Sequence, residues 1–222
     1  MSAQTVGSSA AKIGMIGAGR EGGALGALFV KAGFPVMFSS RNPERLKDLA
    51  AGLGPLAQAG TVAQAVAFGD VVVLAVPYPA LEEIGKTHAS DLAKKVLVMD
   101  VCNPIGRRDG EDLVKRVAEQ GGPGLVTAQW LPGAKIVRAF NAIGAGRLGS
   151  IARPSTSADR VGIPIAGDAQ DAIAAAEMLI RAIGFEPVVV GGLPMGKHLV
   201  PGTPLAGEHS AEELRRIAGT LR

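Results

Sequence analysis

The segment from residue 12 to residue 22 places the tightest constraint on the fold of this 222-residue chain. An apolar run at 12–16 predicts a buried strand, and it leads directly into Gly17-Ala18-Gly19-Arg20-Glu21-Gly22, the pattern G-x-G-x-x-G. A helix rich in small residues is predicted to follow. In this context the first glycine permits a tight turn, the second lets a ligand approach the backbone, and the third lets the helix pack on the strand. Free N–H groups at the start of such a helix bind the phosphates of a dinucleotide. The alternative is a glycine-rich turn without a ligand, and the strand–helix context argues against it.

The end of the second predicted strand indicates which dinucleotide binds. Proteins that bind NAD usually place a carboxylate here to accept a hydrogen bond from the ribose 2′-OH. This chain has Ser39-Ser40-Arg41-Asn42 instead. Arg41 can meet a 2′-phosphate, Ser40 can donate its hydroxyl, and Arg45 adds charge one helical turn later. We therefore predict NADP(H) as the cofactor, with Asn42 capping the next helix. The alternative is that Arg41 is an ordinary surface residue.

Two later loops follow buried strands and are predicted to line the same crevice. Val76-Pro77-Tyr78 follows one apolar run, and Asn103 follows the next. In a doubly wound sheet, the loops at the carboxyl ends of the strands line the nucleotide crevice. Tyr78 is expected to flank the nicotinamide, and Asn103 to bond the ribose or the carboxamide. The alternatives are a rigid loop with a surface tyrosine and an asparagine that caps its own turn.

Strands and helices alternate along the chain, which predicts an α/β fold, a Rossmann doubly wound, mostly parallel sheet with a small C-terminal extension. We expect a disordered tail at 1–10, an NADP-binding Rossmann domain at 11–144, and at 145–222 an α/β extension that completes the sheet and carries the acceptor and dimer surface. The polar segment 144–162 is expected to be a long loop. The predicted strands are 12–16, 34–39, 70–77, 95–101, 134–140, 163–166 and 187–190, and the predicted helices are 20–32, one beginning at 42, 61–68, 80–92, 111–120, 171–183 and 211–221.

The composition of the chain limits the kinds of ligand and partner that it is expected to bind. Cys102 is the single cysteine, which excludes a disulfide within the chain, and no metal site is predicted. The formal net charge of +3 suits an anionic small molecule and is too weak to indicate nucleic acid. No apolar run approaches the roughly 20 residues of a membrane span. We expect a cytoplasmic protein with no membrane contact.

With these motifs assembled, the chain resembles the NADPH:coenzyme F420 oxidoreductase family and the wider group of F420-dependent-type NADP-binding proteins. The resemblance runs over most of 12–193. It implies hydride transfer between NADPH and a deazaflavin (F420) or flavin-like small-molecule acceptor, and a homodimer. The segments that carry it are 12–19, 40–43, 75–77, 100–104, 138–143, 166–168 and 184–187.

The same resemblance assigns individual positions. Residues 139–143, with Ala139 and Asn141, look like the floor of the acceptor pocket. The loop after Ile143 and residues 194–209 depart from the family pattern. The positions that look like nucleotide contacts are Gly17, Gly19, Arg20, Ser40, Arg41, Arg45, Pro77 and Tyr78.

No catalytic acid, base or nucleophile is predicted, because hydride transfer between stacked rings depends on orientation and exclusion of water. His88, His198 and His209 are expected at the surface, with a substrate contact at His198 as the alternative. Two other functions stay open. One is an NADP(H)-binding sensor without turnover, and the other is an NADPH-dependent reductase of another small or metal acceptor. An enzyme predicts a second pocket lined by 141–146 and 194–200, whereas a sensor predicts that this surface is filled.

Overall fold

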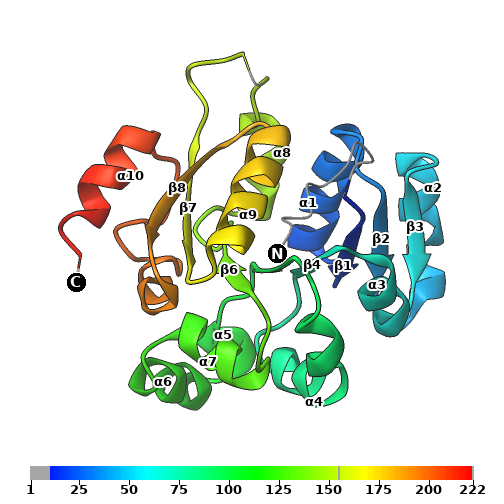
Figure 1. Ribbon diagram of the computed structural model, residues 1–222, viewed down its shortest axis with the longest axis horizontal. Coiled ribbons are helices and arrows are strands. Elements are labelled where there is room, and N and C mark those ends of the chain that lie inside the picture. The colour runs from blue at the N-terminus through cyan, green and yellow to red at the C-terminus, as the bar shows by residue number, and fades with distance from the viewer. Residues whose placement is uncertain (1–10, 155, 222) are drawn as a thin grey trace, which may run out of the picture.

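A computed structural model describes residues 11–154 and 156–221 and contains one eight-stranded sheet (Figure 1). The strand order is β3-β2-β1-β4-β5-β6-β7-β8. Strands β1 to β6 are parallel, β7 is antiparallel to β6, and β8 is parallel to β7. The predicted α/β, mostly parallel sheet is confirmed. The strands are β1 (Ile13–Ile16), β2 (Val36–Ser39), β3 (Ala57–Gly60), β4 (Val71–Leu74), β5 (Leu97–Asp100), β6 (Ile136–Arg138), β7 (Gly162–Gly167) and β8 (Glu186–Gly191).

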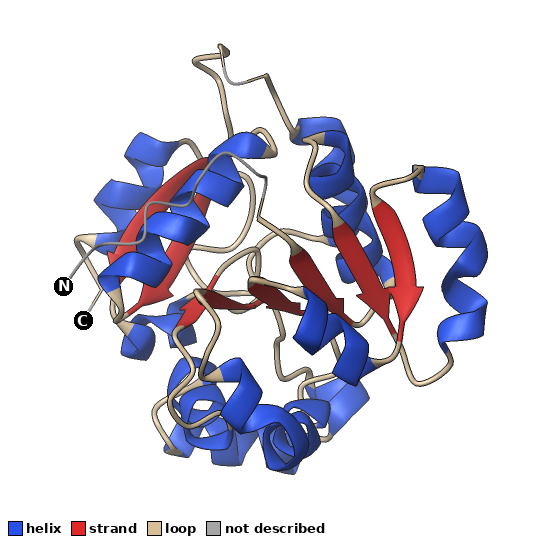
Figure 2. Cartoon of the chain, turned by 45° about the vertical axis from the view of Figure 1, so that its right-hand side comes forward, coloured by secondary structure: helices blue, strands red, loops and turns tan. Residues whose placement is uncertain are grey.

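Helices cover both faces of the sheet (Figure 2). One face packs against η1 (Pro43–Leu46), α1 (Arg20–Lys31), α2 (Lys47–Leu53), α8 (Ala145–Ile151) and α9 (Gln170–Ala182). The opposite face packs against α3 (Val62–Phe68), α4 (Ala80–Leu92), α6 (Glu111–Glu119), α7 (Pro123–Trp130) and η2 (Leu193–His198). The remaining helices are α5 (Gly106–Asp109), after β5, and α10 (Ala211–Ala218), against β7 and β8. Two apolar layers therefore hold the sheet rigid, and its carboxyl edge presents loops.

The apolar run of β4 shows why a strand at the centre of the sheet can be predicted from the sequence. All four of its residues, Val71–Leu74, are buried, as expected of a parallel strand covered on both faces. Helix α3 begins at a capping box in which Gln64 N–H donates to Thr61 Oγ1 and Thr61 N–H donates to Gln64 Oε1. These local signals agree with the tertiary fold.

Five elements of the structure were not predicted from the sequence: β3, α5, α7, α8 and η2. The segment expected to be a loop, 144–162, contains α8, whose Gly146 and Gly149 lower its intrinsic helix propensity. The helix forms because Leu148 and Ile151 are buried against α1 and α9 in the same core. Strand β3, with the sequence AQAG, and helix α7 were not predicted, because neither has a clear apolar period. The predicted tail at 1–10 lies outside the described residues.

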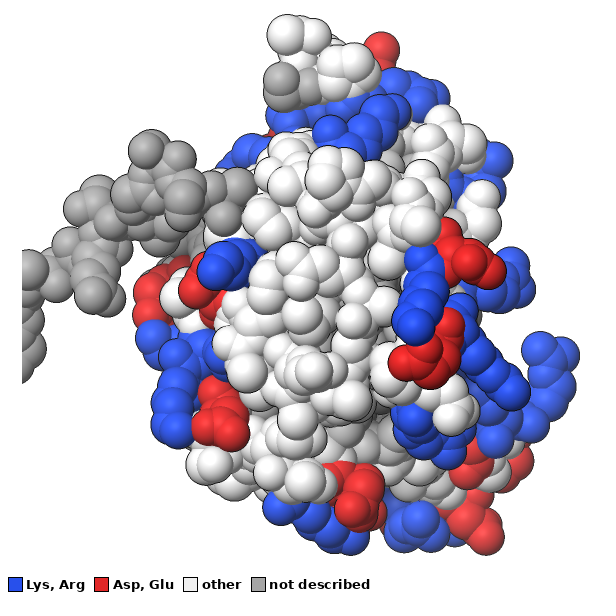
Figure 3. All heavy atoms as spheres, turned by 90° about the vertical axis from the view of Figure 1, so that its right-hand side faces the viewer, with Lys and Arg blue, Asp and Glu red and all other residues white. Residues whose placement is uncertain are grey.

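The edge of the sheet formed by β3 is uncharged over a long stretch of sequence. Strand β3 is one edge, and residues 49–69 carry no charged side chain. Figure 3 shows the corresponding side of the molecule, with a broad uncharged centre bordered by charged residues. This face therefore offers nothing to attract an anionic ligand.

Within 11–154 and 156–221, no helix is both long and apolar enough to cross a bilayer.

Candidate functional site

The three glycines of the motif have three different surroundings. Gly17 has a φ of +96°, and a Cβ there would lie 2.3 Å from Ala75 O. A Cβ on Gly22 would lie 1.9 Å from Gly17 O, so the turn and the helix are in direct backbone contact. A Cβ on Gly19 would meet nothing within 4 Å, and no side chain caps the start of α1. The turn is therefore closed on the protein side and open at Gly19, where helix N–H groups are free for an anion.

Alanine substitutions at these glycines should separate folding from binding. We expect Gly22→Ala to destabilise the protein by about 1–3 kcal/mol or more, because the new Cβ overlaps the Gly17 carbonyl. We expect Gly19→Ala to keep the melting temperature within a few degrees and to weaken NADPH binding, because its Cβ points into open space. Thermal unfolding and cofactor titration on both variants measure this. Equal losses of stability would contradict the assignment.

A cleft of about 790 Å³ opens at the start of α1. Its other walls are the loop after β4, the loop after β5 with α5, and the first turn of α8. Six of the residues predicted to contact a dinucleotide line it together: Gly19, Arg20, Glu21, Val76, Pro77 and Asn103. Gly17, Ala18 and Gly22 do not line this cleft, and Gly22 is buried.

Two arginine side chains near the end of β2 form no ion pair with a carboxylate in the described part of the chain. They are Arg41 and Arg45, and both are exposed. The nearby Glu44 lies 2.5 Å from Lys47 Nζ instead. Ser40 Oγ accepts a hydrogen bond from Asn42 N–H at 3.1 Å, which orders this turn. Asn42 precedes η1 as predicted, but its side chain makes no capping hydrogen bond.

A second cleft, of about 640 Å³, adjoins the first. Both clefts are lined by Glu21, Val101, Asn103, Ile105 and Gly144. The second cleft is closed by residues 140–144 and by a loop that contributes 201–203, Ala206 and Gly207. Gly207 N–H donates to Ala142 O at 2.9 Å and ties the two walls together.

The expectation for this second pocket was correct in one wall and wrong in the other. Of the predicted wall 141–146, residues 141–144 line it, whereas Ala145 and Gly146 line the first cleft. Its C-terminal wall comes from 201–207 instead of 194–200. The reason is that Leu193 and Leu199 are buried in the apolar cores. Because these two leucines are buried, residues 194–200 pack against the sheet, and the following loop at 201–207 lines the cleft instead.

Phe140, whose backbone is strained, determines where the chain leaves the sheet to form the cleft wall at 141–144. Phe140 follows β6 and has a φ of +59°, the single non-glycine residue with positive φ in the described chain. Its ring is buried edge-on against Phe185, with centroids 5.5 Å apart. Packing of this ring holds the backbone in a sparsely populated conformation, as is often seen beside functional sites. The chain thereby turns from the sheet into the cleft wall at 141–144.

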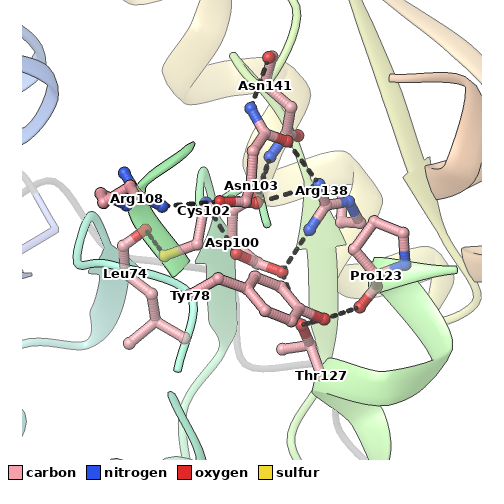
Figure 4. A network of polar contacts seen from close by, with 10 residues as sticks. All are labelled: Leu74, Tyr78, Asp100, Cys102, Asn103, Arg108, Pro123, Thr127, Arg138 and Asn141. Carbon is pink, nitrogen blue, oxygen red and sulfur yellow. Dashed lines mark hydrogen bonds and ion pairs between the residues drawn. The ribbon is translucent and has the colours of Figure 1, made fainter. Parts of the chain in front are cut away.

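Below the clefts lies a buried polar network centred on Arg138 and Asp100 (Figure 4). Both side chains are 0% exposed. Arg138 Nη1 donates to Asp100 Oδ2 at 2.6 Å, and Thr127 Oγ1 donates to the same oxygen at 2.9 Å. Cys102 N–H donates to Asp100 Oδ1 at 2.8 Å. The carboxylate is therefore well satisfied, as a buried charge must be.

The same network orients the asparagines at the cleft floor. Arg138 Nη2 donates to Asn103 Oδ1 at 3.1 Å, and Asn103 Nδ2 donates to Asn141 O at 2.8 Å. Asn141 Nδ2 donates to Asp100 O and Cys102 O. Sequence reasoning missed Arg138, Asp100 and Thr127. The available signal was a charged residue closing each of two otherwise apolar strands, β5 and β6.

Two residues of the predicted site are buried and line neither cleft: Tyr78, expected to flank the nicotinamide, and Ala139, expected in the floor of the acceptor pocket. Tyr78 is 0% exposed, its hydroxyl donates to Pro123 O at 2.8 Å, and its ring packs on Trp130. Burial and the charge of Asp100 raise the pKa of Tyr78 well above its ordinary value. Ala139 is also 0% exposed and lines neither cleft. Asn141 lines the second cleft rather than the first.

Glu21 occupies an unusual environment. It lies in the first turn of α1 and lines both clefts. Its Oε1 is buried and has no hydrogen-bond partner among residues 11–154 and 156–221. Burial raises the pKa of Glu21 to about 7, and the Ala145 N–H and the Arg20 charge oppose this shift only partly.

The histidines do not contribute to either cleft. His88, His198 and His209 are half-buried rather than exposed as expected. His209 Nε2 lies 3.1 Å from Ala206 O, and His198 Nε2 is buried without a partner in the described chain. The alternative of a substrate contact at His198 has no support in the cleft walls.

Part of the chain matches a known protein family. Residues 12–104 match the family "NADP oxidoreductase coenzyme F420-dependent". This match confirms the resemblance seen in the sequence. The matched segment contains the glycine turn, the basic end of β2, and the loops after β4 and β5.

Individual relatives agree with this family. A metalloreductase, STEAP3 of Rattus norvegicus, is 31% identical over 194 residues, which are 86% of this chain and 36% of the relative. The chain thus spans about a third of that protein's length. A hypothetical protein from Sinorhizobium meliloti has a TM-score of 0.73 and 28% identity, covering 92% of this chain and 97% of its own. A protein from Arthrobacter sp., provisionally named an F420 dependent NADP-reductase, has a TM-score of 0.68 and 19% identity, covering 84% and 87%, and supports the fold alone.

Proposed function

We propose that this chain is an NADP(H)-dependent oxidoreductase that transfers a hydride between NADPH and a deazaflavin (F420) or flavin-like acceptor. The observation that carries the proposal is a pair of clefts that meet at the carboxyl edge of the sheet and share the wall around Glu21 and Asn103. A redox enzyme that joins two ring systems needs adjoining sites of this kind, so that the rings approach each other.

The first cleft suits the cofactor. Free N–H groups at the start of α1 would receive the diphosphate beside Gly19. The exposed Arg41 and Arg45 would receive the 2′-phosphate, with Ser40 beside them. Asn103 and Pro77 would line the ribose and nicotinamide end. The bound cofactor would supply the hydride, and the chain would position its ring and exclude water.

The second cleft suits a flat, largely apolar acceptor. Its walls include Val101, Ile105 and Ile143, and Asn141 contributes a buried Oδ1 that has no partner among the described residues. An apolar slot with few polar groups is typical of sites for ring-shaped cofactors and substrates. The family description names coenzyme F420, and this favours a deazaflavin over other acceptors. The extension at 145–222 contributes the loop at 201–207, so we propose that it completes the acceptor site.

An absorbance assay tests the proposal. Purified protein and NADPH are mixed with F420, FMN, FAD, riboflavin or a ferric chelate, and absorbance at 340 nm is followed. Oxidation with F420 or a flavin is the expected result. Oxidation with the ferric chelate alone would favour a metal acceptor, the activity that the name of the rat relative gives to that protein. Binding of NADPH without oxidation by any acceptor would favour an NADP(H) sensor.

A bulky side chain in the second cleft should block the acceptor and spare the cofactor. We expect Ala206→Trp to reduce NADPH oxidation at least about tenfold while the NADPH dissociation constant changes less than about threefold, since Ala206 lines only the second cleft. The matched control is Ala158→Trp, in an unrelated cavity near Arg160. Equal effects of the two substitutions would remove the second cleft from the proposal.

We also propose a homodimer in the cytoplasm, as the family resemblance implies. Within the extension 145–222, expected to carry the dimer surface, Leu193 and Leu199 are buried in the protomer's own cores, so other residues would form the contact. Light scattering on the purified protein gives the oligomeric state. A monomer at micromolar concentration would contradict the proposed assembly without affecting the proposed chemistry.

A further inference from the structure

Glu21 stands where the two clefts meet. Of the titratable residues in the described chain, Glu21 alone lines both clefts, and it is the single one on the wall of the second. It is fixed by the first turn of α1, whose backbone is in contact with the glycine turn through Gly22. Its position is therefore rigid relative to the diphosphate end of the first cleft, while its side chain also borders the second.

The charged and titratable groups around Glu21 come from four elements. Arg20 precedes it on α1 and lowers its pKa only in part. Arg108, on α5, is engaged with Asp109 and Asn103 O, and Arg147, on α8, is paired with Glu208. Cys102, after β5, is buried, and burial raises the pKa of its thiol well above its usual value. None of these side chains forms an ion pair with Glu21 within the described residues.

Structural roles account for only part of this carboxyl group: the Ala145 N–H and the N-terminus of α1 favour its charged form, but its other oxygen is left without a partner. Oε1 is buried without a partner, and a charged oxygen left in that state costs more free energy than it stabilises. An apolar residue would fill the same position without that cost. A carboxyl group that holds its proton near neutral pH avoids the penalty and keeps an O–H to donate.

We propose, resting on the proposed function, that Glu21 is the general acid of the reaction and delivers the proton that the acceptor ring takes up together with the hydride. The C–H bond of the dihydronicotinamide breaks, and its electron pair forms a new bond to the acceptor ring. The electrons displaced within that ring reach a ring nitrogen, which takes the proton from the Glu21 carboxyl group. Glu21 is left as a carboxylate and regains a proton from solvent. One NADPH, one oxidised acceptor and one proton thus give NADP⁺ and the two-electron-reduced acceptor.

The first test does not depend on turnover. Calorimetric titration with NADPH at pH 7, in two buffers of different ionisation enthalpy, measures protons taken up on binding. The anionic cofactor should raise the proton affinity of Glu21, so the wild type should take up to about half a proton more than Glu21→Gln. Any contribution of the cofactor's own phosphate is common to both proteins. Identical proton uptake with intact NADPH binding would overturn the proposal.

The pH dependence of stability gives a second readout on the unliganded protein. A carboxyl whose folded-state pKa is raised from 4.5 to about 7 binds more protons in the native state than in the unfolded state between these values. The free energy of unfolding therefore falls as pH rises through that window, and it loses this component above it. Glu21→Gln should remove this part of the slope. An unchanged slope would argue that Glu21 titrates normally.

Turnover then tests the acid itself, with F420 and FMN as the probes. We expect Glu21→Gln to lower kcat about 100-fold with a dissociation constant for NADPH within about twofold of wild type, in line with the usual contribution of a general acid. The wild-type kcat should fall as pH rises past the pKa of Glu21 in the NADPH complex, which lies above the value of about 7 for the unliganded protein because the cofactor is anionic. The kcat of the variant should not follow this curve. Glu21→Ala should regain activity when formate is added.

The outcomes separate the two proposals. Wild-type rates at all pH values in Glu21→Gln would refute the acid role and leave the proposed function intact. Failure of the wild type to oxidise NADPH with either probe would refute the proposed function, and the acid role would fall with it, even if proton uptake on binding persisted. Loss of folding in Glu21→Gln would be seen in its circular dichroism, and in that case Glu21→Ala with formate rescue decides.

Discussion

Replacing Arg138 by leucine is expected to lower the free energy of unfolding by about 3–5 kcal/mol. The substitution leaves the Asp100 carboxylate 0% exposed with no cation beside it, and Arg138 Nη2 no longer holds Cys102 O and Asn103 Oδ1. For a protein of this size, such a loss corresponds to a melting temperature lower by about 6–20 °C. Thermal and denaturant unfolding measure it. A change of under about 1 kcal/mol would contradict the view that this pair is buried and unscreened.

A double variant separates two effects of replacing Arg138: the unpaired charge left on Asp100 and the loss of side-chain packing. Arg138→Met with Asp100→Asn removes both charges and keeps similar volumes, so we expect it to be more stable than Arg138→Met alone. The matched control is Arg147→Leu, which breaks the exposed pair with Glu208. Solvent screens that pair, and its loss should leave the melting temperature nearly unchanged. A double variant less stable than the single variant would show that Asp100 is held by its other hydrogen bonds.

The network also bears on activity, because it connects the sheet to the cleft floor. Asn103 lines both clefts, and its amide is held by Arg138 on one side and by the backbone of Asn141 on the other. A variant that loosens Arg138 would therefore disturb the wall on which cofactor and acceptor both rest. Its NADPH dissociation constant should rise along with its loss of stability, in contrast to Ala206→Trp.

Short-range patterns located the glycine turn and the loops that line the first cleft, although the residues predicted at the end of β2, Ser40, Arg41, Asn42 and Arg45, are not among its lining residues. The glycine turn, the run of β4 and the basic end of β2 each combine a local signal with a position at the carboxyl end of a parallel strand. The order of elements then determines the topology, since a strand, crossover and parallel strand close right-handedly. Contacts between neighbours in sequence, such as Gly17 with Gly22, follow directly from that motif.

Long-range packing decided what the sequence alone did not predict. Tyr78 reads as a cleft residue because it follows Pro77, but its hydroxyl bonds Pro123 O on α7, a helix 45 residues later that had not been predicted. Likewise α8 forms although two of its residues are glycines, because the core against α1 and α9 stabilises it. In each case the deciding contact lies far away along the chain.

Arg41→Ala is expected to weaken NADPH binding about 10-fold to 150-fold and to leave NADH binding unchanged. Removing one hydrogen-bonded, charge-assisted contact to a phosphate costs about 1.5–3 kcal/mol, and each 1.4 kcal/mol corresponds to a factor of ten in the dissociation constant. Arg41 is exposed at the end of β2 with no carboxylate partner in the described chain, so its charge is free for the 2′-phosphate. Titration of both cofactors by calorimetry or fluorescence measures the difference.

Substitutions of other arginines provide a comparison for the effect of Arg41→Ala on NADPH binding. Arg45→Ala should weaken NADPH binding less than Arg41→Ala, because it stands one turn further along η1, and the double variant should bind NADPH and NADH alike. Arg116→Ala, an exposed arginine on α6, is the matched control and should change neither cofactor. Added salt should reduce the preference of the wild type for NADPH, since the phosphate contact is at the surface. Equal binding of NADH and NADPH by the wild type would refute the assignment of these arginines, because the glycine turn alone does not distinguish the two cofactors.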